Sequence, residues 1–273
     1  MRTAFDETGV IILRGFVGRD ACKALQARTS ELVDAFDPQS VRSIFSSKSN
    51  VQLGDDYFIR SGGDIGFFFE EDAFDAGGEL KQDKRHSINK MGHAMHDIDP
   101  LFDGFSRTPE LAAIAASLGV AEPLLVQSMY IFKPPRIGGE VVCHQDSTYL
   151  YTEPETCIGF WFAIDDADEG NGCMQFVPGG HKAPLRRLNY RTEEGALVTD
   201  VIDDAPLEDH LAAPAPAACG DLVIFHGRAP HMSAPNRSAR PRHAYTVHIV
   251  DGAALWPAQN WLQRPADFPF RGF

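Results

Sequence analysis

The sequence predicts a mainly β protein, a β-barrel or jelly roll with N-terminal helices packed on one sheet. Short runs rich in β-branched and aromatic residues fill the second half of the chain, separated by Gly, Pro and Asn clusters, as in sandwiches and barrels. Helical patterns precede these strands and do not alternate with them, which argues against a doubly wound α/β fold. The length of 273 residues suits one domain of this class.

The N-terminal half is expected to contain one strand and three helices. Residues 10–13 form a short apolar run after a glycine, which indicates a strand. Residues 20–36 carry apolar side chains at roughly helical spacing. A further helix is predicted to begin at Thr108, a capping residue followed by proline, and to end at Gly119. Residues 87–96 are expected to form another helical segment.

The second half supplies most of the predicted strands. They cover residues 124–132, 158–164, 174–177, 222–225 and 245–250. The alanine–proline run at 213–218 is expected to be a stiff loop. No long linker or internal repeat divides the chain, so we predict a single domain over residues 1–273.

The charge and cysteine content exclude several classes of function. The chain has 38 acidic and 25 basic residues and a formal net charge of −13, which is unfavourable for non-specific binding to nucleic acid. No apolar run approaches the ~20 residues of a membrane span, and the N-terminus lacks the apolar region of a signal peptide. The five cysteines include no C-x-x-C pair and indicate reduced thiols. We therefore expect a cytoplasmic protein that acts on a small molecule, without nucleic-acid or membrane partners.

Three residues form a candidate metal site. His144 and Asp146 are separated by one residue, and in a strand such residues point to the same face and can reach one metal. The third ligand must come from far along the chain, and His231, shortly after a predicted strand, is the best candidate. His226 is an alternative third ligand, but its position inside an apolar strand favours a core role.

Two histidines and one carboxylate are the facial ligand set of non-haem Fe(II) oxygenases. Such a set leaves open positions on the metal, so that a 2-oxo acid can occupy two of them and O2 the third. The distal carboxylate of this co-substrate needs a cationic partner. Arg242, in the next predicted strand, offers a bidentate guanidinium, and Ser233 offers a hydroxyl donor.

Other residues have less specific patterns. His93 and His96 are three residues apart and could share a helix face, but without a Glu-x-x-His pattern we expect structural or solvent-facing positions. His181 is assigned to a turn and the aromatic run 67–69 to the core. Residues 189–211 are interpreted as a lid. A small basic cluster before it is expected to be solvated: Lys182, Arg186 and Arg187.

Several segments resemble the phytanoyl-CoA dioxygenase family. Three of them surround the candidate metal site: GGEVVCHQDSTYLYTEP (138–154), NGCMQFVPGGH (171–181) and GDLVIFHGRAPHMSAPNRSARPRHAYTVH (220–248). Four lie outside it: DYFIRSGGDIGFFFE (56–70), SINKMGHAMHDIDPLF (87–102), VQSMYIFK (126–133) and NWLQ (260–263). The resemblance therefore extends over nearly the whole chain.

This resemblance implies a double-stranded β-helix, a cupin-like jelly roll with its core at about 121–252 and helical support at about 1–120. It also implies an Fe(II)- and 2-oxoglutarate-dependent dioxygenase, which hydroxylates a small organic substrate and converts 2-oxoglutarate to succinate and CO2. An acyl-CoA thioester is one candidate substrate. The implied cofactors are Fe(II), 2-oxoglutarate and O2, with ascorbate as a candidate reductant.

The family's site residues can be assigned by matching positions. Three residues would hold iron: His144, Asp146 and His231. Five would contact 2-oxoglutarate, alongside the metal ligands: Lys90, Met129, Trp161, Ser233 and Arg242. Lys133 is an alternative to Lys90. Halogenases of this fold class have a small residue at the carboxylate position, so the presence of Asp146 favours hydroxylation.

Two other functions fit parts of the pattern. The chain could be a non-catalytic module that binds 2-oxoglutarate or a metal, but the complete set of three ligands and Arg242 argues for an enzyme. A cupin-like zinc hydrolase or isomerase would leave Arg242 and Ser233 without a role. No obvious glutamate base lies beside the two histidines to serve such an enzyme.

Overall fold

The computed structural model describes residues 1–49 and 51–273, and β-strands form most of its framework. The strands are β1 (Val10–Leu13), β2 (Ile65–Phe69), β3 (Ile88–His93), β4 (Pro123–Ile131), β5 (Val141–His144), β6 (Ile158–Ala163), β7 (Met174–Phe176), β8 (Arg187–Arg191), β9 (Leu197–Val201), β10 (Ala213–Ala215), β11 (Leu222–His226), β12 (His231–Ser233) and β13 (Ala244–Asp251). The α-helices are α1 (Arg2–Thr8), α2 (Arg19–Ala35), α3 (Asp56–Arg60), α4 (Met95–Ile98), α5 (Pro100–Ser106) and α6 (Pro109–Ser117).

The larger sheet has seven strands in the order β1-β11-β6-β13-β4-β3-β2, and each pair is antiparallel. β1 pairs with β11, and β3 pairs with β4, so segments far apart in the chain lie side by side. The N-terminal part therefore contributes three strands to this sheet as well as helices. The prediction of a mainly helical support before residue 120 underestimated this contribution, because only β1 was anticipated.

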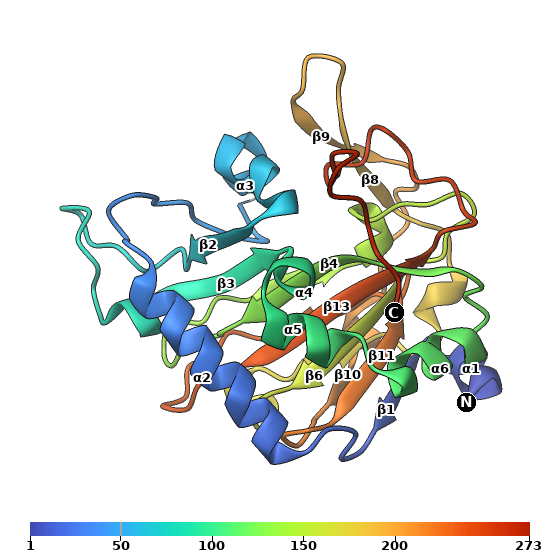
Figure 1. The fold of residues 1–273 in the computed structure, drawn as a ribbon, viewed down its shortest axis with the longest axis horizontal. Coiled ribbons are helices and arrows are strands. Elements are labelled where there is room, and N and C mark those ends of the chain that lie inside the picture. The colour runs from blue at the N-terminus through green and yellow to red at the C-terminus, as the bar shows by residue number, and fades with distance from the viewer. Residues whose placement is uncertain (50) are drawn as a thin grey trace.

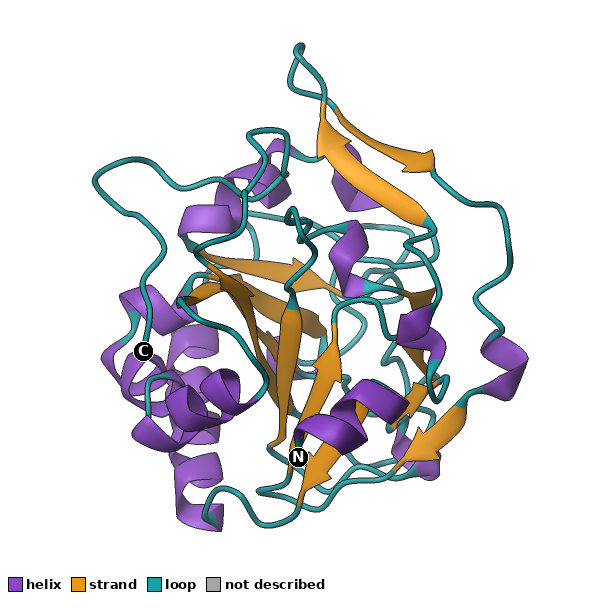
Figure 2. Ribbon diagram, turned by 90° about the vertical axis from the view of Figure 1, so that its right-hand side faces the viewer, coloured by secondary structure: helices purple, strands orange, loops and turns teal. Residues whose placement is uncertain are grey.

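Both faces of the larger sheet are buried. In β6, Phe160 and Phe162 belong to the core on the helical side, whereas Trp161 and Ala163 belong to the core between the two sheets. This alternation follows from the two-residue period of a strand. Figure 1 shows α2 and α5 in front of the sheet, and Figure 2 shows helices gathered on one side of the strands. The helices thus leave the other face of the sheet free to build a site.

The smaller sheet has the order β10-β7-β12-β5 and packs on the face of the larger sheet opposite the helices. Met174 and Phe176 from β7 contribute its side of the shared core. A separate hairpin, β8–β9, projects at the top of Figure 1. The two stacked sheets form the predicted jelly roll, a mainly β fold with N-terminal helices.

Three local predictions can be compared with the structure. Thr108 caps α6 as expected, because its side chain accepts a hydrogen bond from the backbone N–H of Leu111. The helix predicted at 87–96 was wrong, since most of this segment is β3 and only its end enters α4. The run at 213–218 is not only a loop: β10 pairs with β7 there, at an edge of the sheet where proline is tolerated.

Two absences hold for the described residues. All five cysteines are free, so no disulfide forms within this part of the chain. No helix in residues 1–49 and 51–273 has both the length and the apolar character needed to cross a membrane.

Candidate active site

The three candidate metal ligands meet where the smaller sheet faces the larger one. His144 is the last residue of β5 and His231 the first of β12, and these two residues are direct cross-strand partners. Asp146 opens the 3-10 helix Asp146–Thr148, so it lies just outside the strand on which it was predicted. Its Oδ1 lies 3.3 Å from His144 Nε2 and 3.7 Å from His231 Nε2. One ligand atom from each residue can be chosen so that all three lie within 4.8 Å of one another.

Backbone hydrogen bonds fix which ring nitrogen of each histidine carries its proton. Nδ1 of His144 donates to the carbonyl of Val142 at 2.8 Å, and Nδ1 of His231 donates to that of Ala229 at 3.0 Å. Both Nε2 atoms therefore keep free lone pairs, and both face the carboxylate of Asp146. Two lone pairs and an anionic oxygen repel one another unless a cation lies between them, so this donor set fits a divalent metal.

Burial and mutual contacts shift the pKa values of the three candidate ligands in different directions. Burial lowers the pKa of His231 to about 4, so the ring is neutral at physiological pH. Burial also acts to lower the pKa of His144, but the hydrogen bond and charge of Asp146 outweigh it and raise that pKa. Burial acts to raise the pKa of Asp146, but the neighbouring histidines hold it well below its ordinary value. The carboxylate is therefore ionised.

His248, which the sequence analysis missed, holds the second oxygen of the carboxylate. Its Nε2 lies 2.8 Å from Asp146 Oδ2, and the ring is buried. His248 lies on β13, on the same face as Thr246, because alternate residues of a strand share a face. Extending this alternation from the predicted Arg242 would have identified it. The contact leaves Oδ1 of Asp146 directed toward the two histidines.

Arg242 lines a cavity of about 740 Å³ that the triad also lines, here called the Arg242 cavity. The side chain is 1% exposed, and its Nε and Nη1 have no hydrogen-bond partner among the described residues. Trp161 Nε1 and Thr246 Oγ1 are also buried in this cavity without a partner in that part of the chain. Burial lowers the pKa of Arg242 to about 10, which still leaves the guanidinium charged at neutral pH. A buried cation with unpaired donors indicates a site for an anion.

A buried lysine, Lys133, lines the same cavity as Arg242. Nζ of Lys133 donates to Ser233 Oγ at 2.9 Å and to the carbonyl of Gly139 at 2.7 Å. Burial and the charge of Arg242 lower the pKa of Lys133 well below its ordinary value. Glu70, also missed by the sequence analysis, is 2% exposed in the same cavity, and burial raises its pKa. The predicted Ser233 therefore contacts a lysine as well as lining the cavity.

Lys90 and Met129 lie between two cavities. The ammonium of Lys90 is 3.5 Å from the ring centroid of Phe45 and 3.5 Å from the sulfur of Met129. Burial lowers the pKa of Lys90 to about 7. Both residues line the Arg242 cavity and also a second cavity, so each could contact a ligand in either space.

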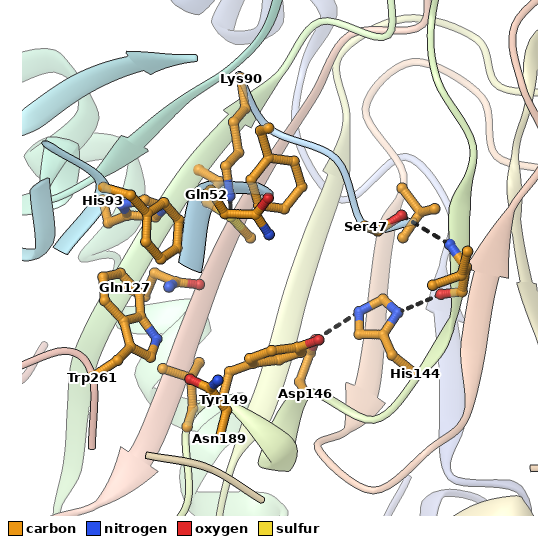
Figure 3. Close-up of a pocket in the computed structure, with 16 residues that line it drawn as sticks. Ser47, Gln52, Lys90, His93, Gln127, His144, Asp146, Tyr149, Asn189 and Trp261 are labelled. Atoms are coloured by element: carbon orange, nitrogen blue, oxygen red, sulfur yellow. Dashed lines mark hydrogen bonds and ion pairs between the residues drawn. The ribbon is translucent and has the colours of Figure 1, made fainter. Parts of the chain in front are cut away.

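The second cavity, of about 720 Å³, is here called the Trp261 cavity. Its lining includes aromatic residues, amides and the first two triad residues: Phe45, Phe58, Tyr149, Trp261, Gln52, Gln127, Asn189, His144 and Asp146. Figure 3 shows His93, Gln127 and Trp261 on one side of this space and His144 on the other.

The remaining predicted residues take other positions. His226 is not a ligand of the triad, because its ring lies against Phe5 and His181, at centroid distances of 6.1 and 5.3 Å. His96 is buried and bonded to Ser128, as a structural residue would be. His93 is neither solvent-facing nor on a helix: it ends β3 and lines the Trp261 cavity.

The aromatic run 67–69 and the predicted lid 189–211 lie in strands and their connections. Phe67, Phe68 and Phe69 are buried core residues on β2, as expected. The segment 189–211 contains the end of β8 and all of β9, and Asn189 on β8 lines the Trp261 cavity. In the basic cluster before it, Arg186 pairs with Asp203.

Comparison with known proteins supports these observations. The phytanoyl-CoA dioxygenase (PhyH) family profile matches residues 5–244. Phytanoyl-CoA dioxygenase 1 of Oryza sativa subsp. japonica is 44% identical over 262 residues, which cover 95% of this chain and 92% of the rice protein. Phytanoyl-CoA dioxygenase domain-containing protein 1 of Bos taurus is 42% identical over 275 residues, covering 97% and 94%.

Solved structures show the same fold at lower identity. The epimerase SnoN, solved in complex with Fe3+, alpha ketoglutarate and nogalamycin RO, superposes with a TM-score of 0.66 at 15% identity. The match covers 100% of this chain and 91% of that structure. The extent and identity of the sequence matches show that the chain belongs to the phytanoyl-CoA dioxygenase family.

Proposed function

We propose that the protein is an Fe(II)- and 2-oxoglutarate-dependent oxygenase that hydroxylates a small organic substrate, with oxidative decarboxylation of 2-oxoglutarate to succinate and CO2. One observation carries the proposal: two imidazoles and a carboxylate converge beside a cavity that contains a buried arginine whose Nε and Nη1 have no partner among the described residues. The first group fits a divalent iron, and the second fits a dicarboxylate that reaches the metal from the same side.

The residues of the triad would hold the metal. His144, His231 and Asp146 offer one ligand atom each, and His248 keeps Asp146 oriented. Iron bound there would supply activation of O2, driven by oxidation of the 2-oxo acid, with ascorbate able to keep the metal reduced. Because the carboxylate is present, we expect hydroxylation and not halogenation.

The Arg242 cavity would hold 2-oxoglutarate. Arg242 offers a bidentate pair of donors to the distal carboxylate, with Ser233 and Trp161 beside it. Lys133 donates to Ser233, and the charge of Arg242 lowers its pKa. This position favours Lys133 as the lysine nearest the distal carboxylate. Lys90 and Met129 would contact the part of the co-substrate nearer the Trp261 cavity.

The Trp261 cavity would receive the organic substrate. Its aromatic rings would pack against an apolar body and hold it beside the triad, with the amides of the lining available to its polar groups. Among the described residues of this lining, Lys90 is the sole lysine or arginine. The lining therefore lacks a cluster of cations for the phosphates of a CoA thioester and favours a smaller molecule.

Two alternatives make different predictions. A non-catalytic module would bind iron and 2-oxoglutarate without converting the 2-oxoglutarate to succinate. A zinc hydrolase would bind its metal without needing a 2-oxo acid, and the unpaired donors of Arg242 would serve no purpose. Metal analysis after anaerobic purification separates the zinc protein from the iron protein.

Succinate formation tests the proposal. The purified protein is supplied with Fe(II), ascorbate, O2 and 2-oxoglutarate, and succinate is measured with each component omitted in turn. We expect slow succinate formation that needs iron and that rises when a metabolite screen includes the substrate. Asp146→Ala should abolish it, whereas Asp20→Ala, at a fully exposed carboxylate, should not. An Asp146→Ala protein as active as the wild type would overturn the proposal.

A further inference from the structure

We infer that His93 presents a bare hydrogen-bond acceptor to the Trp261 cavity, so that the ligand held there carries a hydroxyl or N–H donor on an apolar, ring-sized body. Calling this ligand the substrate rests on the proposed function. The hydrogen bonds, burial and lining residues around His93 carry the inference.

The tautomer of His93 follows from its neighbour. The hydroxyl of Ser61 donates to the carbonyl of Phe58 at 2.6 Å, which uses its proton. Ser61 Oγ lies 2.9 Å from His93 Nδ1, so at this contact the oxygen must accept and the ring nitrogen must donate. The other nitrogen, Nε2, therefore carries a lone pair and no proton.

This lone pair has no partner. His93 is 0% exposed, and Nε2 has no hydrogen bond to any described residue. Burial lowers the pKa of His93 well below its ordinary value, so the ring does not gain a second proton at neutral pH. A buried acceptor without a donor is costly, and such groups in native proteins usually await a ligand or an ordered water.

The surroundings of His93 define the rest of the ligand. Aromatic rings enclose the imidazole: the centroids of Trp261, Phe58 and Phe68 lie 5.1, 5.4 and 5.6 Å from its own. Phe58 and Trp261 are stacked at 4.8 Å, and both line the cavity. Flat apolar walls of this kind favour a ring over a flexible polar chain.

The position of His93 suggests which end of the ligand it holds. In Figure 3, His93 lies on the side of the cavity away from His144. A donor bound at His93 would anchor one end of the molecule and leave its other end toward the triad. His93 would then act as a specificity-determining residue, because a ligand without a donor leaves Nε2 unpaired.

Matched probes test this inference without knowledge of the natural substrate. Phenol and toluene have nearly the same shape, but only phenol offers a donor. Each is titrated calorimetrically, without O2, into protein loaded with Fe(II) and 2-oxoglutarate. We expect His93→Phe to weaken the binding of phenol about tenfold, since it removes one buried hydrogen bond. The affinity for toluene should change less than about twofold. His93→Gln, which restores an acceptor, should recover most of the phenol affinity.

One control variant and one substitute variant keep the outcome decisive. His226→Phe replaces a histidine outside the Trp261 cavity and should leave both affinities unchanged. If His93→Phe does not fold, His93→Leu, which also lacks an acceptor, takes its place, because the amides of the lining prevent the wild type alone from deciding. Unchanged phenol affinity in His93→Phe, or no phenol binding to the wild type, would overturn the inference. Succinate assays on the same samples test the proposed function separately.

Discussion

The two cavities that meet at the triad differ in the hydrogen bonds they leave unmade. The Arg242 cavity contains a buried guanidinium and an indole N–H without acceptors, on Arg242 and Trp161, together with two unpaired acceptors, Glu70 Oε1 and His248 Nδ1. The Trp261 cavity has aromatic walls and a buried acceptor without a donor, on His93. An anion therefore suits the first space, and an apolar molecule with a donor suits the second. The difference indicates how one metal site can take two ligands without either occupying the other's place.

Lys90 lines both cavities, and its removal should cause the largest change in free energy. Burial lowers its pKa from 10.5 to about 7, so between these values the unfolded chain binds more protons than the folded protein. The stability of the wild type therefore rises with pH through this window. Lys90→Met should stabilise the cofactor-free protein by as much as about 4 kcal/mol near pH 7.

Urea unfolding of Lys90→Met and the wild type at several pH values checks this expectation. The stability gain should shrink as the pH rises and vanish above about pH 10.5, where the lysine is neutral in both states. A gain that stays constant with pH would show that Lys90 is not held in a desolvating site between the cavities. Succinate formation should fall in Lys90→Met, because a buried lysine that destabilises the fold is expected to serve activity.

His248 acts where the two cavities meet, because it orients the carboxylate of Asp146, which lines both of them. His248→Phe removes the hydrogen bond to Asp146 Oδ2 and should weaken Fe(II) binding about 10- to 100-fold. His248→Gln can still donate to that oxygen, so its affinity for Fe(II) should fall much less. Equal iron affinity in His248→Phe and the wild type, measured by anaerobic titration, would contradict this role.

Lys133 should affect the Arg242 cavity alone. Lys133→Met removes the amine that donates to Ser233 Oγ and should weaken 2-oxoglutarate binding about tenfold. Iron affinity and phenol binding in the Trp261 cavity should stay the same. If 2-oxoglutarate affinity is unchanged in Lys133→Met, Lys133 is a structural residue and the co-substrate lysine is Lys90.

The framework of the site could be predicted because strand periodicity and residue type determine it. The strands around Trp161 and Arg242 follow runs of β-branched and aromatic residues, and His144, Asp146 and His231 come together in the fold. The helix predicted at 87–96 failed because a strand buried on both faces lacks the apolar–polar alternation that identifies a strand.

The residues that were missed depend on contacts that no local pattern shows. Glu70 and His248 reach the site through sheet pairing between distant segments. His93 appeared equivalent to His96 in the sequence, yet one lines a cavity and the other bonds to Ser128. The unpaired nitrogen of His93 becomes visible only once Ser61, on a different segment, is placed beside it.

Anaerobic binding of 2-oxoglutarate to Arg242→Ala tests the central claim most directly. The matched control is Arg240→Ala, two residues away, whose guanidinium is exposed and pairs with Asp168. We predict that Arg242→Ala weakens 2-oxoglutarate about 100-fold, because it removes the partner of a buried anion, while iron affinity is retained and Arg240→Ala matches the wild type. Equal 2-oxoglutarate affinity in Arg242→Ala and Arg240→Ala would contradict the assignment of the Arg242 cavity to the co-substrate.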